Sequence, residues 1–183
     1  MDAFFHDVSP GTVQLTVTNL GLSTGEFVSG LYLNLNPAYN SSLGNLLFTP
    51  VSSSGSFTAP SISLGVDSFK ADGDGKYDIL FNFDTSGSGR FEANEAFTYT
   101  ITGIPGLVST DFIFLSMPAG GHGPFDAAIH IQGIAIGDSG WADPSKGGVI
   151  VGNVPEPSSG ILLVVAMGLV GGGRWLLRRA KQS

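Results

Sequence analysis

The chain has 183 residues, no cysteine and a formal net charge of −7. The absence of cysteine excludes disulfides, thiolate metal sites and cysteine nucleophiles. Residues 1–153 carry 4 basic and 14 acidic side chains, a net charge of −10, whereas residues 154–183 carry 4 basic side chains and 1 acidic one. An acidic domain repels phosphate groups, so nucleic acid is not expected as a partner.

Apolar and polar residues alternate with a period of two in about eight short segments, which is the pattern of half-buried β-strands. Clusters of Gly, Pro, Asn and Ser separate these segments, and no helical pattern lies between them. Residues 1–152 are therefore expected to form one all-β domain, an antiparallel β-sandwich with a jelly-roll-like arrangement. The expected strands are residues 12–18, 27–35, 46–49, 62–66, 77–83 and 97–102, with further strands around Phe112 and Phe114, Ile129 and Ile131, and Val149 and Val151.

An acidic, glycine-rich sequence from Asp72 to Asp78 leads into the expected strand at 77–83. Asp72, Asp74 and Asp78, with glycines between them, resemble part of a calcium loop, since Ca²⁺ binds 6–8 oxygen ligands. The EF-hand pattern is incomplete, so a tight Asp-Gly turn is the alternative. Within the strand, the side chains expected on one face are those of Tyr77, Ile79, Phe81 and Phe83.

Other polar and aromatic residues give weaker signs of chemistry. His130 lies among apolar residues of an expected strand and is interpreted as a hydrogen-bonded structural group, because no zinc-binding spacing surrounds it. Glu92 and Glu95 could be a glycosidase pair, but a separation of three residues places them on opposite faces of a strand. Trp141 lies in an expected loop, where packing is favoured over stacking on a sugar. No nucleophile, phosphate-binding or dinucleotide motif is present, so enzymatic activity is not expected.

The C-terminal segment combines a proline-rich break, an apolar run and a basic end. Pro155, Glu156 and Pro157 favour an extended backbone, because proline disfavours the helical conformation in the residue before it. Residues 158–177 provide about 20 residues with one charge, enough for a helix across ~30 Å of hydrocarbon. The positive-inside rule places the C-terminus in the cytoplasm and the β domain outside. The basic flank consists of Arg174, Arg178, Arg179 and Lys181, and residues 178–183 form the basic tail.

This arrangement resembles the PEP-CTERM sorting signal of Gram-negative bacteria, which would span residues 153–183. The resemblance implies that exosortase, a membrane-embedded processing enzyme, recognises the segment, cuts near the motif and delivers the protein to the cell surface or extracellular matrix. The β domain also resembles a globular region that such proteins carry, at residues 71–81, 130–134 and 139–141. Such proteins normally begin with a secretory signal peptide, which residues 1–7 do not resemble. Either the true N-terminus lies upstream of Met1 or the chain is a fragment.

The leading hypothesis is therefore a non-enzymatic, exported protein that is anchored in the inner membrane through residues 158–177 until its signal is processed. Its expected partners are exosortase, the lipid bilayer and extracellular polysaccharide. The alternative is a Ca²⁺-dependent carbohydrate-binding module on the cell surface, with calcium at Asp72, Asp74 and Asp78. A secreted hydrolase is less favoured.

Overall fold

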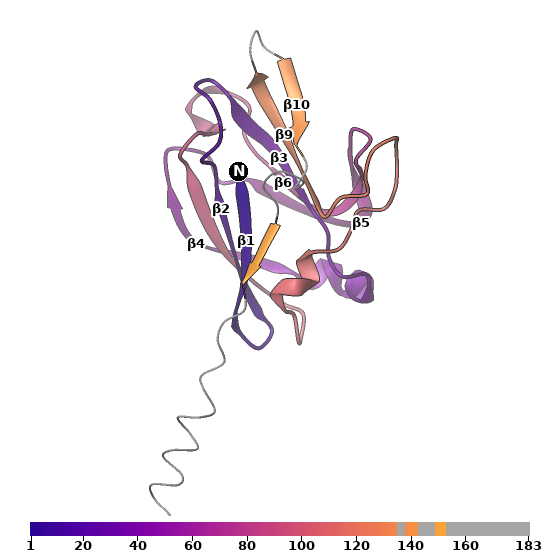
Figure 1. The fold of residues 1–183 in the computed structure, drawn as a ribbon. Helices are drawn as coiled ribbons and strands as arrows, with labels where there is room; N and C mark the ends of the chain where they lie inside the picture. Colours follow the sequence, from indigo (N-terminus) through magenta and orange to yellow (C-terminus); the bar gives the residue numbers. More distant parts are fainter. Residues whose placement is uncertain (135–137, 143–148, 153–183) are drawn as a thin grey trace, which may run out of the picture. The chain divides into compact units, whose positions relative to one another are not determined.

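The computed structural model describes residues 1–134, 138–142 and 149–152 (Figure 1). The chain divides into two units, Met1–Asn153 and Val154–Ser183. The second unit lies outside the described residues, and with it the predicted membrane helix at 158–177.

The first unit is built from β-strands and a few short 3₁₀-helices, which confirms the predicted all-β class. The strands alternate buried and more exposed side chains, as β2 and β8 show most clearly. The strands are β1 (Asp2–Ser9), β2 (Thr12–Thr18), β3 (Phe27–Leu33), β4 (Leu47–Ser54), β5 (Ser61–Ala71), β6 (Gly75–Asn82), β7 (Phe91–Glu92), β8 (Ala96–Thr102), β9 (Ala127–Ile134), β10 (Asp138–Ala142) and β11 (Val149–Gly152). The 3₁₀-helices are η1 (Pro37–Asn45), η2 (Gly87–Gly89) and η3 (Ser109–Phe112).

These strands form two sheets. The first sheet has the order β11-β1-β2-β8-β4, and the second has the order β10-β9-β3-β6-β5, with β7 beside β3. Neighbouring strands within the described residues pair antiparallel, except that β11 pairs parallel to β1. β4 and β5 therefore end their sheets, and residues 55–60 carry the chain from one edge strand to the other.

The core of the domain lies between the two sheets. Phe81 of the second sheet packs against Phe97 and Tyr99 of the first, with ring centroids 6.0 Å apart in both cases. Burying apolar side chains of this kind supplies the main favourable term in folding. Other buried residues in this cluster are Phe5, Val13, Leu15, Val17 and Ile101 from the first sheet, and Leu31, Leu33 and Ile79 from the second.

Most of the predicted strands are confirmed, but the one around Phe112 and Phe114 is wrong. Phe112 lies in η3, and its ring stacks on Phe5 with the centroids 4.5 Å apart. An apolar residue is needed at this position for packing, although the position is not part of a strand. The sequence interpretation also missed β10 and β1, although β1 buries Ala3 and Phe5 in alternation.

Candidate functional site

The acidic sequence at 72–78 forms the tight turn that joins β5 to β6. The Asp74 amide donates to the Ala71 carbonyl at 2.7 Å, which closes the turn. Gly73 and Gly75 have φ angles of 98° and 121°, in a region that glycine reaches without steric cost. The predicted Asp-Gly turn is therefore present.

The three candidate calcium ligands differ in exposure and in the contacts they make. Asp72 is exposed, and Asp74 lies 3.5 Å from His122 Nδ1 (Asp74 Oδ1). Asp78 is buried, and its carboxylate accepts the backbone amides of two residues from outside the turn. Among the residues that the structure describes, no three His, Asp or Glu side chains lie close enough together to hold one metal ion. The calcium site stays a prediction, and an ion there would compete with the amides that Asp78 binds.

Asp78 fills a bulge in β5. The register of β5 with β6 jumps from Leu64–Ile79 to Phe69–Tyr77, so that residues 65–68 face Asp78 alone. The carboxylate accepts the Asp67 amide at 2.8 Å (Oδ1) and the Leu35 amide, just beyond β3, at 3.1 Å (Oδ2). A single side chain thus connects β6 to both of its neighbours and satisfies one buried and one half-buried backbone donor.

Tyr77 belongs to a second cluster of buried residues beside the main core. Ile79 and Phe81 lie in the main core, as expected, whereas Tyr77 packs with Ala71 and Ala128. Tyr77, Ile79 and Phe81 are all buried, as the alternation along β6 predicts.

The segment from Ser116 onward packs on the same turn. The Lys76 amide donates to the Met117 carbonyl at 2.8 Å, and the Met117 amide donates back at 3.0 Å. The Ser116 hydroxyl donates to the Asp74 carbonyl at 2.8 Å. A Cβ on Gly75 would overlap the Ser116 side chain, so the approach requires glycine. The turn therefore serves as a packing site for this segment.

His130 has a structural environment, in agreement with its interpretation from the sequence. Its Nδ1 lies 2.7 Å from the hydroxyl of Ser29, the residue at the irregularity in the β3–β9 pairing. Its ring stacks on Trp141 at 4.6 Å, and Trp141 in turn contacts Tyr32 at 5.3 Å. Burial lowers the pKa of His130, and the negative charge of Asp72 partly opposes this shift. The His130–Ser29 contact thus stabilises a bulge, and Trp141 packs in the outer cluster.

Glu92 and Glu95 do not converge on a common space. The Glu95 carboxylate accepts the Glu92 amide at 2.7 Å and the Ser56 amide at 2.8 Å. Glu92 itself is exposed. Glu95 therefore holds the turn before β8 against the segment that follows β4.

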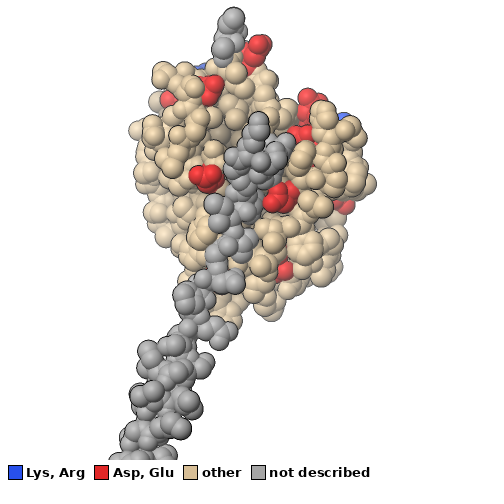
Figure 2. All heavy atoms as spheres, in the orientation of Figure 1, with Lys and Arg blue, Asp and Glu red and all other residues tan. Residues whose placement is uncertain are grey.

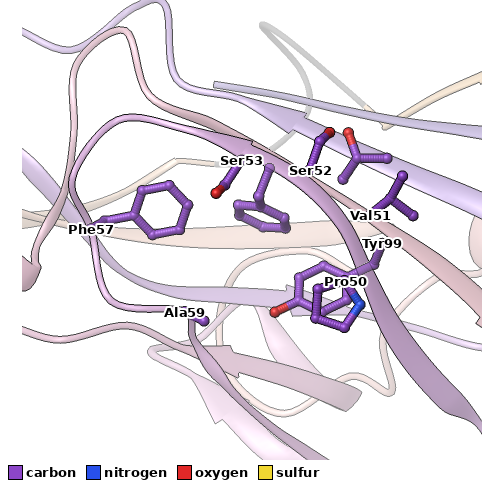
Figure 3. A pocket seen from close by; sticks show the side chains of 9 residues that line it. Pro50, Val51, Ser52, Ser53, Phe57, Ala59 and Tyr99 are labelled. Carbon is purple, nitrogen blue, oxygen red and sulfur yellow. The ribbon is translucent and has the colours of Figure 1, made fainter.

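A pocket that the sequence did not indicate lies at the edge of the sandwich, beside β4 (Figure 3). Its volume is about 250 Å³. Phe97 and Tyr99 were interpreted as core residues, because alternation along β8 carries no sign of a gap beside them. The lining residues are Pro50, Val51, Ser52, Ser53, Phe57, Ala59, Phe97, Thr98 and Tyr99.

The charged surface of the described residues is mainly acidic. Figure 2 shows Asp and Glu side chains spread over the face drawn, with Lys and Arg visible only near its margin. Arg90 places its guanidinium 4.2 Å from the ring centre of Phe27, so part of its charge faces an aromatic ring. A polyanionic ligand would meet net repulsion on such a surface.

The predicted sorting motif (Pro155, Glu156, Pro157) and its basic flank (Arg174, Arg178, Arg179, Lys181) lie outside the described residues. Within the part of the chain that is described, no helix has both the length and the apolar composition needed to cross a bilayer. Comparison with protein-family models, curated proteins and solved structures finds no match. The sorting function therefore stays a prediction from the sequence.

Proposed function

We propose that this chain is a non-enzymatic, exported protein of the cell surface or extracellular matrix, sorted through a PEP-CTERM signal that exosortase processes. The observation that carries the proposal is the order of three elements in the C-terminal sequence: Pro155-Glu156-Pro157, an apolar run at 158–177, and a basic end. Each element has a physical task, namely an extended site for a protease, a membrane span and a cytoplasmic anchor.

The C-terminal segment follows the β domain in the sequence, and this order supports the proposal. β11 ends at Gly152, shortly before Pro155, and pairs with β1 at the edge of the first sheet. The last strand among the described residues thus ends before the motif begins. In the proposed arrangement, a jelly-roll-like sandwich lies outside the membrane, and a helix at 158–177 anchors it until cleavage releases it.

The proposed lack of catalysis draws support from how the candidate residues are used. Asp78 and Glu95 hold backbone amides, and His130 pairs with a buried serine. Side chains committed to such contacts are poorly placed to transfer protons to a substrate.

Expression in two hosts tests the sorting proposal. The full chain, placed behind a secretory signal peptide, is produced in a host with exosortase and in the same host without it, and intact mass is measured. We expect a C-terminally shortened product only where exosortase is present. Identical masses in both hosts would overturn the proposal.

A pair of variants makes the test specific to the motif. Replacing Pro155, Glu156 and Pro157 by alanine should leave the chain uncut, whereas replacing the neighbouring Ser158 and Ser159 by alanine should not. Equal processing of the two variants would show that cleavage does not depend on the motif.

A further inference from the structure

The pocket beside β4 is lined by a tyrosine hydroxyl that is open to the pocket and has no hydrogen-bond partner among the described residues. Tyr99 is only 5% exposed, yet its hydroxyl makes no hydrogen bond to any residue that the structure describes. Figure 3 shows this hydroxyl directed toward the side of the pocket where Ala59 lies. Burial raises the pKa of Tyr99, so the hydroxyl keeps its proton and is available as a donor. Tyrosine is common at binding surfaces, because its ring offers apolar contact and its accessible hydroxyl offers a hydrogen bond.

A second buried tyrosine shows what a satisfied hydroxyl looks like in this fold. Tyr77 is fully buried, and its hydroxyl donates to the Asp74 carbonyl at 3.4 Å. The Tyr99 hydroxyl differs in that it faces the pocket, where it is available to a ligand with a polar atom.

The other residues that line the pocket favour a ligand that also has apolar surface. Phe57 and Phe97 supply aromatic surface, and Pro50 adds an aliphatic ring. None of the lining residues is charged, so an ionic group would lose its hydration without compensation. The volume lies below the ~300–1,000 Å³ of drug-sized ligand sites, which suits a single ring.

A second, polar depression adjoins the pocket, since Ala59 lines both. The depression has a volume of about 500 Å³. Hydrogen bonds from Ser86 lower the pKa of Asp84, so its carboxylate stays ionised and accepts hydrogen bonds. Besides Ala59, the lining residues are Thr58, Ser61, Asn82, Phe83, Asp84 and Thr85.

We propose that this pocket and the adjoining depression bind a neutral saccharide chain, with one sugar ring between Phe57, Phe97 and Tyr99 and its neighbour along the polar depression. A pyranose combines C–H faces, which pack on aromatic rings, with hydroxyls that pair with Tyr99, Asn82 and Asp84. The acidic domain disfavours anionic polysaccharides. An aliphatic chain would fill the first pocket but leave the Tyr99 hydroxyl unpaired. The proposal requires neither calcium nor the sorting signal.

Titration with defined oligosaccharides tests this site. The full-length chain is held in an amine-oxide detergent, because a detergent with a sugar headgroup would compete, and calorimetry follows the addition of cellotetraose, chitotetraose or mannotetraose. Sodium decanoate serves as the aliphatic probe. We expect at least one tetraose to bind, and decanoate not to compete with it.

Variants assign the binding to the pocket. Tyr99→Phe deletes only the hydroxyl and should weaken binding about 3- to 10-fold, as expected for one hydrogen bond. Tyr39→Phe is the matched control, since Tyr39 lies in η1 and does not line the pocket, and it should bind like the wild type. Ala59→Arg, at an exposed position between the two depressions, should weaken the tetraose more than a methyl glucoside.

Three results would overturn the proposal. These are the absence of binding by every tetraose at millimolar concentration, equal affinities for Tyr99→Phe and Tyr39→Phe, and displacement of the tetraose by decanoate. Circular dichroism of each variant confirms that it is folded. Loss of exosortase processing would leave all of these titrations unchanged, so this proposal and the sorting proposal fail separately.

Discussion

The edge strands of the two sheets, β4 and β5, are both irregular, but the irregularities have opposite consequences. In β5 the register shifts between Leu64 and Phe69, and the carboxylate of Asp78 fills the bulge and binds two amides. In β4 the register shifts between Pro50 and Ser52, and a pocket lies alongside, into which the Tyr99 hydroxyl opens without a partner among the described residues. One irregularity is therefore filled by a carboxylate that holds the strands together, whereas the other lies beside open space.

Both irregularities also protect the edges on which they lie. Exposed edge strands are templates for unwanted pairing, and proline and bulges reduce that risk. Pro50 cannot donate a hydrogen bond, and β4 is exposed along most of its length.

The largest effect on stability should follow from removing the carboxylate that fills the bulge in β5. Asp78→Ala leaves the buried amide of Leu35 and the half-buried amide of Asp67 without their acceptor, and we expect a loss of about 2–4 kcal/mol in the free energy of unfolding. Urea unfolding followed by tryptophan fluorescence measures it. Asp72→Ala removes an exposed carboxylate of the same turn and should change stability by less than about 0.5 kcal/mol.

The same pair of variants also tests calcium. If Asp72, Asp74 and Asp78 formed a calcium site, millimolar Ca²⁺ would raise the melting temperature of the wild type, and Asp72→Ala would reduce that rise. A similar loss of stability in both variants without Ca²⁺ would contradict the assignment of Asp78 as the structural joint.

The next effect concerns the turn beside the bulge. Gly75→Ala imposes a φ of 121° on a residue with a Cβ and drives that Cβ into Ser116, so we expect a loss of about 2–3 kcal/mol. Gly121→Ala is the control, because nothing lies within 4 Å of its added Cβ and its φ is not positive. Thermal unfolding of both variants measures the difference. A small loss in Gly75→Ala would mean that the segment from Ser116 packs less closely on the turn.

The sequence predicted regular parts of the fold well and the irregular parts poorly. β2 and β8 were correct because every second residue is buried, so their pattern is complete within one segment. The bulge in β5 was not predicted, because the four residues inserted opposite Asp78 leave no sign in the sequence of the partner strand. The pocket was missed because Tyr99 follows the alternation of a core strand.

Among the candidate site residues, too, local features were predictable from the sequence and long-range contacts were not. The Asp-Gly turn was predictable, since its glycines are a local signal. The amides that Asp78 binds come from residues 11 and 43 positions away, and no local pattern indicates them. The C-terminal signal is a local motif that lies outside the described residues and stays a prediction.

A smaller effect, dependent on pH, should come from the His130–Ser29 contact. Burial lowers the pKa of His130 in the folded state below its ordinary value of about 6.5, so the unfolded chain binds more protons in that range. Stability due to His130 is therefore present above about pH 6.5 and is lost as the pH falls through the folded-state pKa. Because the ring is partly exposed, we expect a change below about 1 kcal/mol.

Comparison with His130→Gln isolates the contribution of His130 to the pH dependence of the free energy of unfolding. Urea unfolding of the wild type and of His130→Gln is measured between about pH 7.5 and pH 5. The difference in stability between the two should shrink toward acid, because all the other titratable groups are common to both proteins. A constant difference would show that His130 does not titrate with folding.

The smallest effect on stability should be that of Tyr99→Phe, and it is the sharpest test of the comparison between the two edges. Because the Tyr99 hydroxyl has no partner in the described residues, its removal should leave the free energy of unfolding within about 0.5 kcal/mol of the wild type. Tyr77→Phe, which removes a hydroxyl bonded to Asp74, should cost about 1 kcal/mol. Urea unfolding of the two variants without saccharide measures both. An equal loss in both would mean that the Tyr99 hydroxyl is already satisfied, and that the pocket beside β4 is a joint of the same kind as the bulge that Asp78 fills.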